Sequence, residues 1–392
     1  MTAPLTLRFL LPGLAIVLAA CGDQSPQSDS GGARDAVAGF LASHWAAPRQ
    51  AQGNAPGTAQ APDRSLAPAR CGACHRAQLE DWRGSLHSLA MGPGVAGQLV
   101  TMSDAERDDC QRCHAPLQEQ SDPRSPLFSE GMVCAACHMR NGRVFGPARR
   151  DGSMLVAADG LPHGGWTASP AFEDSRFCAA CHQFGADGFA LNGKMLENTY
   201  EEWRASAFAA RGVQCQDCHM PDRRHLWRGI HDPETVRGAL RITLDAEPPG
   251  DEAVVTLTIA SVGVGHHFPT YVTPLVVVRG ELIDRAGRPV PGSAEERMIG
   301  RQVALDLSRQ IADTRIPAGG QARFVFRRRV DRTGLRFRGT VTVRPDEFYA
   351  GFFESLLAAG AGAGTAQIRE AQRAARGSAF VIFERDVPLT RE

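Results

Sequence analysis

The chain has 392 residues, and its 43 Lys and Arg balance 43 Asp and Glu. A formal net charge of zero gives no reason to expect nucleic acid as a partner. At this length, with 43% hydrophobic residues, the composition is that of a globular protein.

The N-terminus predicts export. Arg8 precedes an apolar run over Phe9–Ala20, which is too short for a mature transmembrane helix but fits a signal peptide. The run ends at Cys21 in a sequence that resembles the cleavage site of bacterial lipoproteins. We therefore predict a lipoprotein signal peptide over residues 1–20 and lipid attachment at Cys21. Several acyl chains on this one residue would anchor the protein stably to a membrane. Residue 22 is Gly and not the Asp that typically retains such lipoproteins in the inner membrane, so the sequence favours an outer-membrane location. The alternative is an ordinary cleaved signal with an incidental cysteine.

Residues 21–68 are expected to hold a tether and one short helix. The polar segment 22–34 is typical of a flexible linker. A helix is predicted over Asp35–Ala47, with Val37, Phe40, Leu41 and Trp45 on its apolar side. A second Pro-, Gln- and Gly-rich stretch then runs to Pro68.

Five copies of Cys-X-X-Cys-His follow between residues 71 and 219. This spacing is typical of covalent c-type haem attachment, in which the two thiols bond the haem and the His binds one axial position of the iron. Zinc is the alternative for paired cysteines, but zinc does not require a His directly after every second Cys. We predict five covalently bound haem c groups, with haem-binding residues Cys71, Cys74, His75, Cys110, Cys113, His114, Cys134, Cys137, His138, Cys178, Cys181, His182, Cys215, Cys218 and His219.

The segment 69–235 is predicted to be the pentahaem domain. Ten of the eleven cysteines belong to the motifs, which leaves only Cys21 and therefore no disulfide framework. Too little chain accompanies each haem to build a separate protein core. We expect short helices, long loops and haems packed closely enough to exchange electrons.

The second axial ligand of each haem determines what that haem does. A haem with two His ligands carries electrons, whereas an open haem can bind and transform a small molecule. Seven His lie outside the motifs. At positions 266 and 267 neighbouring strand residues would point to opposite faces, so only one should reach iron, and we prefer His267. His44 could equally be a surface residue. The predicted iron ligands beyond the motif His are His87, His163, His225, His231 and His267.

One internal repeat is visible. Residues 80–87 align with residues 201–208, and the Trp, Arg and Ser positions match, but His87 corresponds to Phe208. The first copy therefore offers an iron ligand that the second lacks. Tyr200 and Tyr271 could serve as donors near a haem, although Tyr in such positions is usually half-buried packing.

The pattern changes after residue 235. Segments with a period of two, separated by Gly and Pro turns, predict an antiparallel β-sandwich over 236–346, with strands at 241–244, 255–259, within 273–282, at 322–326 and at 340–343. Helices at 348–359 and 367–376 and a last strand at 379–383 complete a C-terminal segment, 347–392. The predicted fold class is multidomain α + β, with a mainly helix-and-loop cytochrome c domain before the sandwich.

Three elements resemble a known family. The Trp-X-X-Ser-X-His element ending at His87, and Cys215–Pro221 with His225 and Gly229–Asp232, look like the multihaem family that includes the tetrahaem cytochrome of ammonia oxidisers and hydroxylamine oxidoreductase. Gly265–Thr270 resembles the start of a β-domain in related bacterial cytochromes. The resemblance implies a multihaem fold and electron transfer, and it leaves the substrate open.

The leading functional prediction is an exported, lipid-anchored pentahaem cytochrome. It would pass electrons along closely packed haems between redox partner proteins, on the periplasmic side or at the outer membrane, as a carrier rather than an enzyme. The alternative is a multihaem oxidoreductase that acts on a small nitrogen or sulfur compound at one open haem. In a third reading the β-sandwich docks the haem domain into a larger complex.

Overall fold

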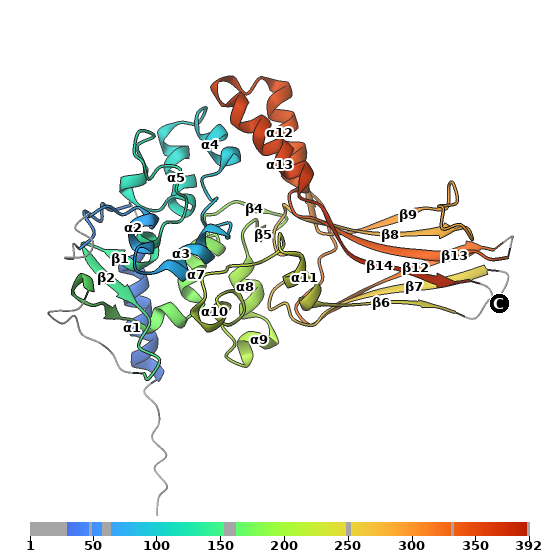
Figure 1. The fold of residues 1–392 in the computed structure, drawn as a ribbon, viewed down its shortest axis with the longest axis horizontal. Coiled ribbons are helices and arrows are strands. Elements are labelled where there is room, and N and C mark those ends of the chain that lie inside the picture. Colours follow the sequence, from blue (N-terminus) through green and yellow to red (C-terminus); the bar gives the residue numbers. More distant parts are fainter. Residues whose placement is uncertain are drawn as a thin grey trace, which may run out of the picture.

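The computed structural model describes residues 30–46, 49–56, 64–152, 162–247, 252–330 and 333–389. The predicted signal peptide, Cys21 and the first part of the tether lie outside these residues. A rounded part of short helices and loops occupies one end of the molecule, and two elongated sheets extend from it (Figure 1). In the described part, no helix has both the length and the apolar character needed to cross a bilayer.

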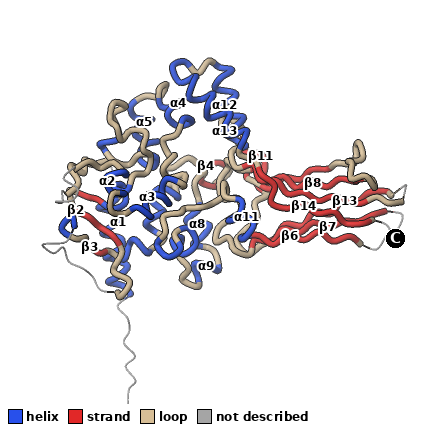
Figure 2. The backbone as a smooth tube through the Cα atoms, in the orientation of Figure 1, coloured by secondary structure: helices blue, strands red, loops and turns tan. Residues whose placement is uncertain are grey.

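The rounded part is built from many short elements joined by loops (Figure 2). The first helix, α1, spans Ser30–His44, so it begins inside the segment expected to be a linker. The helices that follow are α2 (Pro68–Gly72), α3 (Arg76–Arg83), α4 (Pro93–Leu99), α5 (Asp104–His114), α6 (Cys134–His138), α7 (Arg176–His182), α8 (Thr199–Arg204), α9 (Ala207–Ala210), α10 (Cys215–His219) and α11 (Pro233–Ala239). The short strands are β1 (Met139–Arg140), β2 (Arg143–Gly146), β3 (Thr167–Ala168), β4 (Ala190–Leu191) and β5 (Lys194–Met195).

Two antiparallel sheets form the elongated part. One has the strand order β12–β7–β6 and the other β14–β13–β8–β9. The strands are β6 (Leu240–Ala246), β7 (Glu252–Ser261), β8 (Leu275–Ile283), β9 (Glu295–Ile299), β12 (Gln321–Arg329), β13 (Arg336–Arg344) and β14 (Phe380–Pro388), and the pair β10 (Arg301–Val303) and β11 (Gln310–Asp313) lies beside them. The prediction of helices combined with antiparallel sheets is confirmed.

The two sheets share one apolar core. Along β7 and β13 buried and less buried residues alternate, as a strand with one face on a core requires. Phe326 of the first sheet and Phe337 of the second lie 5.2 Å apart between ring centroids, and both are fully buried. Gly280 leaves them space, because a Cβ there would come within 2.3 Å of Phe337. The residues of the core therefore interlock across the sheets.

The C-terminal segment joins both parts. Its strand β14 pairs with β13 along the second sheet, so this strand belongs to the sheet structure. Its helices α12 (Glu347–Ala359) and α13 (Thr365–Gly377) fold back onto α4 in the rounded part (Figure 1). The closest approach is between two glycines, since a Cβ on Gly364 would lie 2.1 Å from the carbonyl oxygen of Gly97.

Replacing Gly364 by Ala is expected to lower the free energy of unfolding by about 1–3 kcal/mol, because the added methyl overpacks this helix contact. Chemical denaturation of the full chain measures the change. Gly377→Ala is the matched control, since no atom lies within 4 Å of its Cβ position. Equal stability of both variants would show that a methyl group on Gly364 makes no steric conflict with Gly97.

Candidate haem-binding site

The five motifs lie on single turns of helix. In α5, α6, α7 and α10 the motif His is the last helical residue, and the first motif runs from α2 to the turn before α3. Residues three apart lie on the same side of a helix. Each turn therefore presents both cysteines and the adjacent His toward one side, as attachment to a single macrocycle requires.

Four of the five motif imidazoles are oriented through Nδ1. This nitrogen lies within hydrogen-bond distance of an oxygen in each case: Ala90 O for His114 (2.6 Å), Phe145 O for His138 (2.9 Å), the Tyr271 hydroxyl for His182 (2.9 Å) and Arg228 O for His219 (2.7 Å). A carbonyl oxygen can only accept, so Nδ1 carries the proton at His114, His138 and His219. Nε2 is then left with its lone pair for a metal, which is the usual arrangement of metal-binding His.

Four of the motif rings each face a second imidazole. The separations between ring centroids are 6.4 Å for His75 and His163, 6.1 Å for His138 and His225, 6.2 Å for His182 and His87, and 6.3 Å for His219 and His266. An imidazole nitrogen bonds a metal at about 2 Å, so two rings on opposite sides of one ion stand roughly 6 Å apart. The four pairs fit one iron each.

The facing imidazoles are themselves held by Nδ1. His163, His225 and His266 contact the oxygens of Gly165 (2.8 Å), Arg223 (3.1 Å) and His267 (2.8 Å). His163 adopts the left-handed conformation with φ of 46°, which is costly for a residue with a Cβ and is typical of functional positions. His87 differs, because its buried Nδ1 has no partner. Burial lowers the pKa of His87 to about 3, so its ring is neutral and able to bind metal.

Two predicted iron ligands lie elsewhere. His266, not the preferred His267, faces His219, because Gly265–Thr270 forms a loop after β7 and the strand argument does not apply there. Nδ1 of His267 lies 3.3 Å from the Glu202 carboxylate. His231 also faces a carboxylate, since its Nε2 lies 3.0 and 3.1 Å from the two oxygens of Asp346. Within the described residues, neither ring pairs with a motif His.

Two His remain to be placed: His44, which lies outside the motifs, and His114, which belongs to the second motif. His44 is buried rather than on the surface, and it packs against Phe40, Trp45 and Phe177 with both ring nitrogens unpartnered. Burial lowers its pKa to about 3. His114 is the motif His that faces no second imidazole in the part of the chain that the structure describes. Within the described residues, the second motif thus differs from the other four in having no paired imidazole.

The internal repeat has a common structural role. Trp82 and Trp203 each donate a hydrogen bond from the indole nitrogen to a carbonyl two residues before a motif, at Met132 (2.7 Å) and Val213 (2.9 Å). Each copy therefore positions the start of a haem-binding helix. In the first copy, the residues after Trp82 bring His87 opposite His182. In the second copy, Phe208 takes the place of this His and lies beside Gly265, which precedes His266.

Two aromatic residues near the haem ligands were not assigned from the sequence. The ring of Trp227 lies 4.6 Å from His87 and 5.1 Å from His225, so it packs against two of the facing imidazoles. Tyr271, expected to be packing, hydrogen-bonds His182 through its hydroxyl. Neither Trp227 nor Tyr271 lies in a recognisable sequence motif, so the sequence alone gives no signal for these roles.

Contacts between cysteines show which motifs are neighbours. Three cysteine pairs lie close enough for each member to shift the pKa of the other: Cys71 with Cys134, Cys113 with Cys181 and Cys178 with Cys215. Cys137 lies near enough to the fourth motif for its charge to raise the pKa of Cys178 and Cys181. The first motif therefore adjoins the third, and the third adjoins the fourth. The fourth also adjoins the second and the fifth, so it lies at a branch point.

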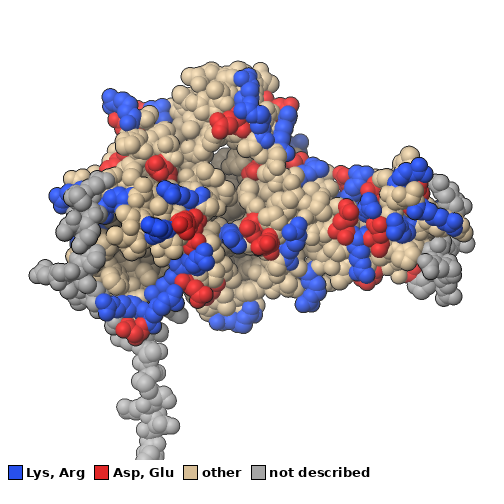
Figure 3. Space-filling model, in the orientation of Figure 1, with Lys and Arg blue, Asp and Glu red and all other residues tan. Residues whose placement is uncertain are grey.

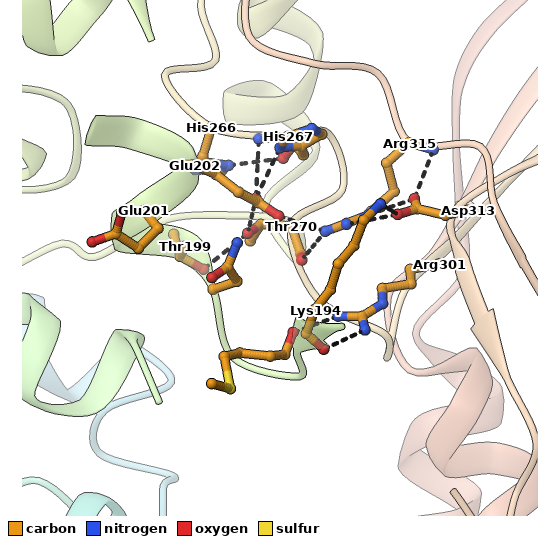
Figure 4. Close-up of polar contacts among 12 residues, drawn as sticks. Lys194, Thr199, Glu201, Glu202, His266, His267, Thr270, Arg301, Asp313 and Arg315 are labelled. Carbon is orange, nitrogen blue, oxygen red and sulfur yellow. Dashed lines mark hydrogen bonds and ion pairs between the residues drawn. The ribbon is translucent and has the colours of Figure 1, made fainter. Parts of the chain in front are cut away.

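A buried polar network fastens the sheets to this site (Figure 4). Glu202 of α8 and Arg315, beyond β11, form an ion pair at 2.7 Å, with side chains only 2% and 3% exposed. Arg315 also binds Asp313, which pairs with Lys194 at 2.7 Å. The buried Arg301 of β10 donates to the carbonyl oxygens of Leu191 (3.0 Å) and Lys194 (2.8 Å) around the β4–β5 turn.

Comparisons with known proteins find similar cytochromes. A family model described as cytochrome c554 and c-prime matches residues 70–140, which include the first three motifs. A pentahaem cytochrome c552 from Thermochromatium tepidum has a similar fold, with a TM-score of 0.60 and 17% identity over 81% of this chain and 97% of that one. No curated protein matches the chain.

Two further solved structures are too distant to support an argument. A Northeast Structural Genomics Consortium target has a TM-score of 0.18 and 12% identity over 38% of this chain and 86% of that one. A β-glucuronidase from glycoside hydrolase family 2 has a TM-score of 0.16 and 8% identity over 27% of this chain and 10% of that one. The relation to hydroxylamine oxidoreductase stays a prediction. The motifs, the family match over residues 70–140 and the shared fold together support a multihaem c-type cytochrome.

Proposed function

We infer that this protein is an exported, lipid-anchored pentahaem cytochrome that carries electrons between redox partner proteins. The observation that carries this inference is the set of four imidazole pairs at 6.1–6.4 Å. His163, His225, His87 and His266 would each complete the coordination of one haem. A haem closed on both faces by His exchanges electrons without binding substrate.

The order of the motifs supports the same function. The first, third and fourth motifs are successive neighbours, and the second and fifth both adjoin the fourth. Electrons entering at the second or fifth motif would reach every other haem through the fourth, and electrons entering at the first would reach the fourth by way of the third. The lipid anchor at Cys21 would keep this path near a membrane, where a donor or acceptor protein could dock.

The oxidised, fully loaded protein is expected to show four low-spin haems with two His ligands and one haem of a different type. Electron paramagnetic resonance measures the ratio, and quantification of covalent haem gives the total of five. Loss of His163, by His163→Ala, should convert one of the four low-spin signals, whereas His44→Ala should convert none. Fewer than four low-spin haems in the unmodified protein would contradict the proposal.

A second candidate function concerns the haem at His114. Of the described residues, no imidazole faces His114, and polar groups lie near its motif. The charges of Asp346, Glu197 and Cys110, together with burial, raise the pKa of Tyr349 in α12. The surface is also hollowed between the C-terminal helices and the rounded part (Figure 3). This arrangement favours an oxidoreductase that acts on a small nitrogen or sulfur compound at one open haem.

Nitrite and hydroxylamine separate the two functions. An electron carrier would not consume nitrite or hydroxylamine. Its reduced haems would stay reduced after either compound is added. An oxidoreductase would show a changed signal of the haem at His114 when the compound binds, and would then exchange electrons with it. Tyr349→Phe should slow that turnover but leave electron transfer between partner proteins unchanged.

A further inference from the structure

A row of polar groups leads from one haem ligand to a carboxyl group that the proposed function does not use. His182 Nδ1 lies 2.9 Å from the Tyr271 hydroxyl. Tyr271 in turn lies close enough to the Thr199 side chain for that hydroxyl to influence the pKa of Tyr271. The Thr199 hydroxyl then lies 2.9 Å from Oε1 of Glu197. The row crosses from the loop between β7 and β8 to the start of α8, so it depends on the contact between the two parts of the molecule.

The same hydroxyls have too few protons for their contacts. Thr199 also lies 2.9 Å from the Thr270 hydroxyl, which is 2.7 Å from Oε2 of Glu202. The contacts from Thr199 to Glu197, Thr199 to Thr270 and Thr270 to Glu202 number three, whereas the two threonine hydroxyls supply two protons. Glu202 is already paired with Arg315, so a third proton that completes the network would lie on Glu197.

The surroundings of Glu197 favour that proton. Burial raises the pKa of Glu197 to about 8, and the negative charge of Glu202 adds to the effect. The other titratable groups that face it are Tyr271, Tyr349 of α12 and Cys113 of α5. Cys113 would carry no charge once it is bonded to haem. Thr199 opposes the shift through hydrogen bonds to the carboxylate.

We propose that Glu197 is a proton-binding site coupled to the electron on the haem held by His182. This inference deepens the proposed electron-transfer function and depends on it. When that haem accepts one electron from a one-electron donor protein, Glu197 takes one proton from the solvent and forms one O–H bond. When the electron leaves for the acceptor, the bond breaks and the proton returns to the solvent.

Electrostatics connect the two events. An added electron would make the haem more negative, and this favours the neutral form of a nearby acid. Tyr271 contacts His182 through its hydroxyl, and the charge of Glu197 raises the pKa of Tyr271, so the carboxyl group lies within electrostatic reach of the haem ligand. Since the fourth motif adjoins three others, an electron that crosses the protein would meet this proton site.

Spectroelectrochemical titration of the full, haem-loaded chain between about pH 6 and pH 10 tests the proposal. One of the five haems is expected to show a potential that falls as the pH rises, by up to about 59 mV per pH unit, the one-electron equivalent of a tenfold change in an equilibrium constant. Glu197→Gln should remove that slope. Infrared difference spectra should show a carboxylic acid band that appears on reduction and is missing in this variant.

Glu201→Gln is the matched control, because Glu201 is four residues away and pairs with Arg204 on the surface. It should keep both the slope and the infrared band. Tyr271→Phe, which keeps the carboxyl but removes the hydroxyl beside His182, should weaken the slope. An unchanged slope in Glu197→Gln would overturn the proposal. If the Glu197→Gln protein still shows four low-spin haems, an unchanged slope contradicts only the proton site and leaves the proposed electron transfer intact. Fewer than four low-spin haems would contradict the proposed function itself.

Discussion

His266→Ala is expected to convert the haem at His219 from low spin to high spin, whereas His267→Ala should leave it low spin. The His266 ring is stacked opposite His219 at 6.3 Å, and Nδ1 of His266 is held by the carbonyl oxygen of His267. Removal of this imidazole would leave one axial position without a protein ligand. A change of axial ligand also moves the potential of a haem.

Electron paramagnetic resonance of the two variants makes a matched comparison between neighbouring residues. One low-spin signal should be lost in His266→Ala, and a small added imidazole should restore it. His267→Ala removes the ring beside Glu202 and should reduce stability without changing any spin state. A high-spin haem in His267→Ala but not in His266→Ala would reverse the assignment.

Arg315→Met is expected to lower the free energy of unfolding by about 3–5 kcal/mol, because it leaves the carboxylate of Glu202 buried without its partner. The Arg315 and Glu202 side chains are 3% and 2% exposed, so solvent cannot replace the lost ion pair. Arg315 also donates to the Thr270 carbonyl oxygen at 2.7 Å, and this contact would be lost as well. Chemical denaturation of the haem-loaded chain measures the difference.

Two further variants isolate the buried charge as the cause. Arg309→Met removes an exposed Arg from the turn between β10 and β11 and should change the stability little. The double variant Arg315→Met with Glu202→Gln should recover part of the loss, since no unpaired charge would then remain. If the double variant were less stable than Arg315→Met alone, the desolvated carboxylate would not be the source of the effect.

Features set by local spacing could be predicted from the sequence. The haem motifs are contained in five residues each, and the strands around 255–259 and 340–343 follow from alternation along the chain; both strands are present. The helices at 348–359 and 367–376 are confirmed within a few residues. In these cases the interactions that determine the structure lie close together in the sequence.

Features set by tertiary contacts could not be predicted in the same way. The choice between His266 and His267 depends on a loop conformation, and it is His266, not the preferred His267, whose ring lies opposite His219. His231 looked available for iron, but its partner Asp346 is 115 residues away. Glu202 and Arg315 are separated by 113 residues, so neither residue alone indicates a buried ion pair. The role of Tyr271 depends on its contact with His182, 89 residues earlier.

The loop between β7 and β8 also has a consequence for how the protein is assembled. It carries both His266 and Tyr271, which reach motifs that leave the ribosome earlier. The fourth and fifth haems can be bonded to their cysteines before this loop exists in its final position. Maturation would therefore end with the docking of the sheets, and a chain cut after α11 would carry all five haem motifs yet lack the groups that finish two of the haem environments.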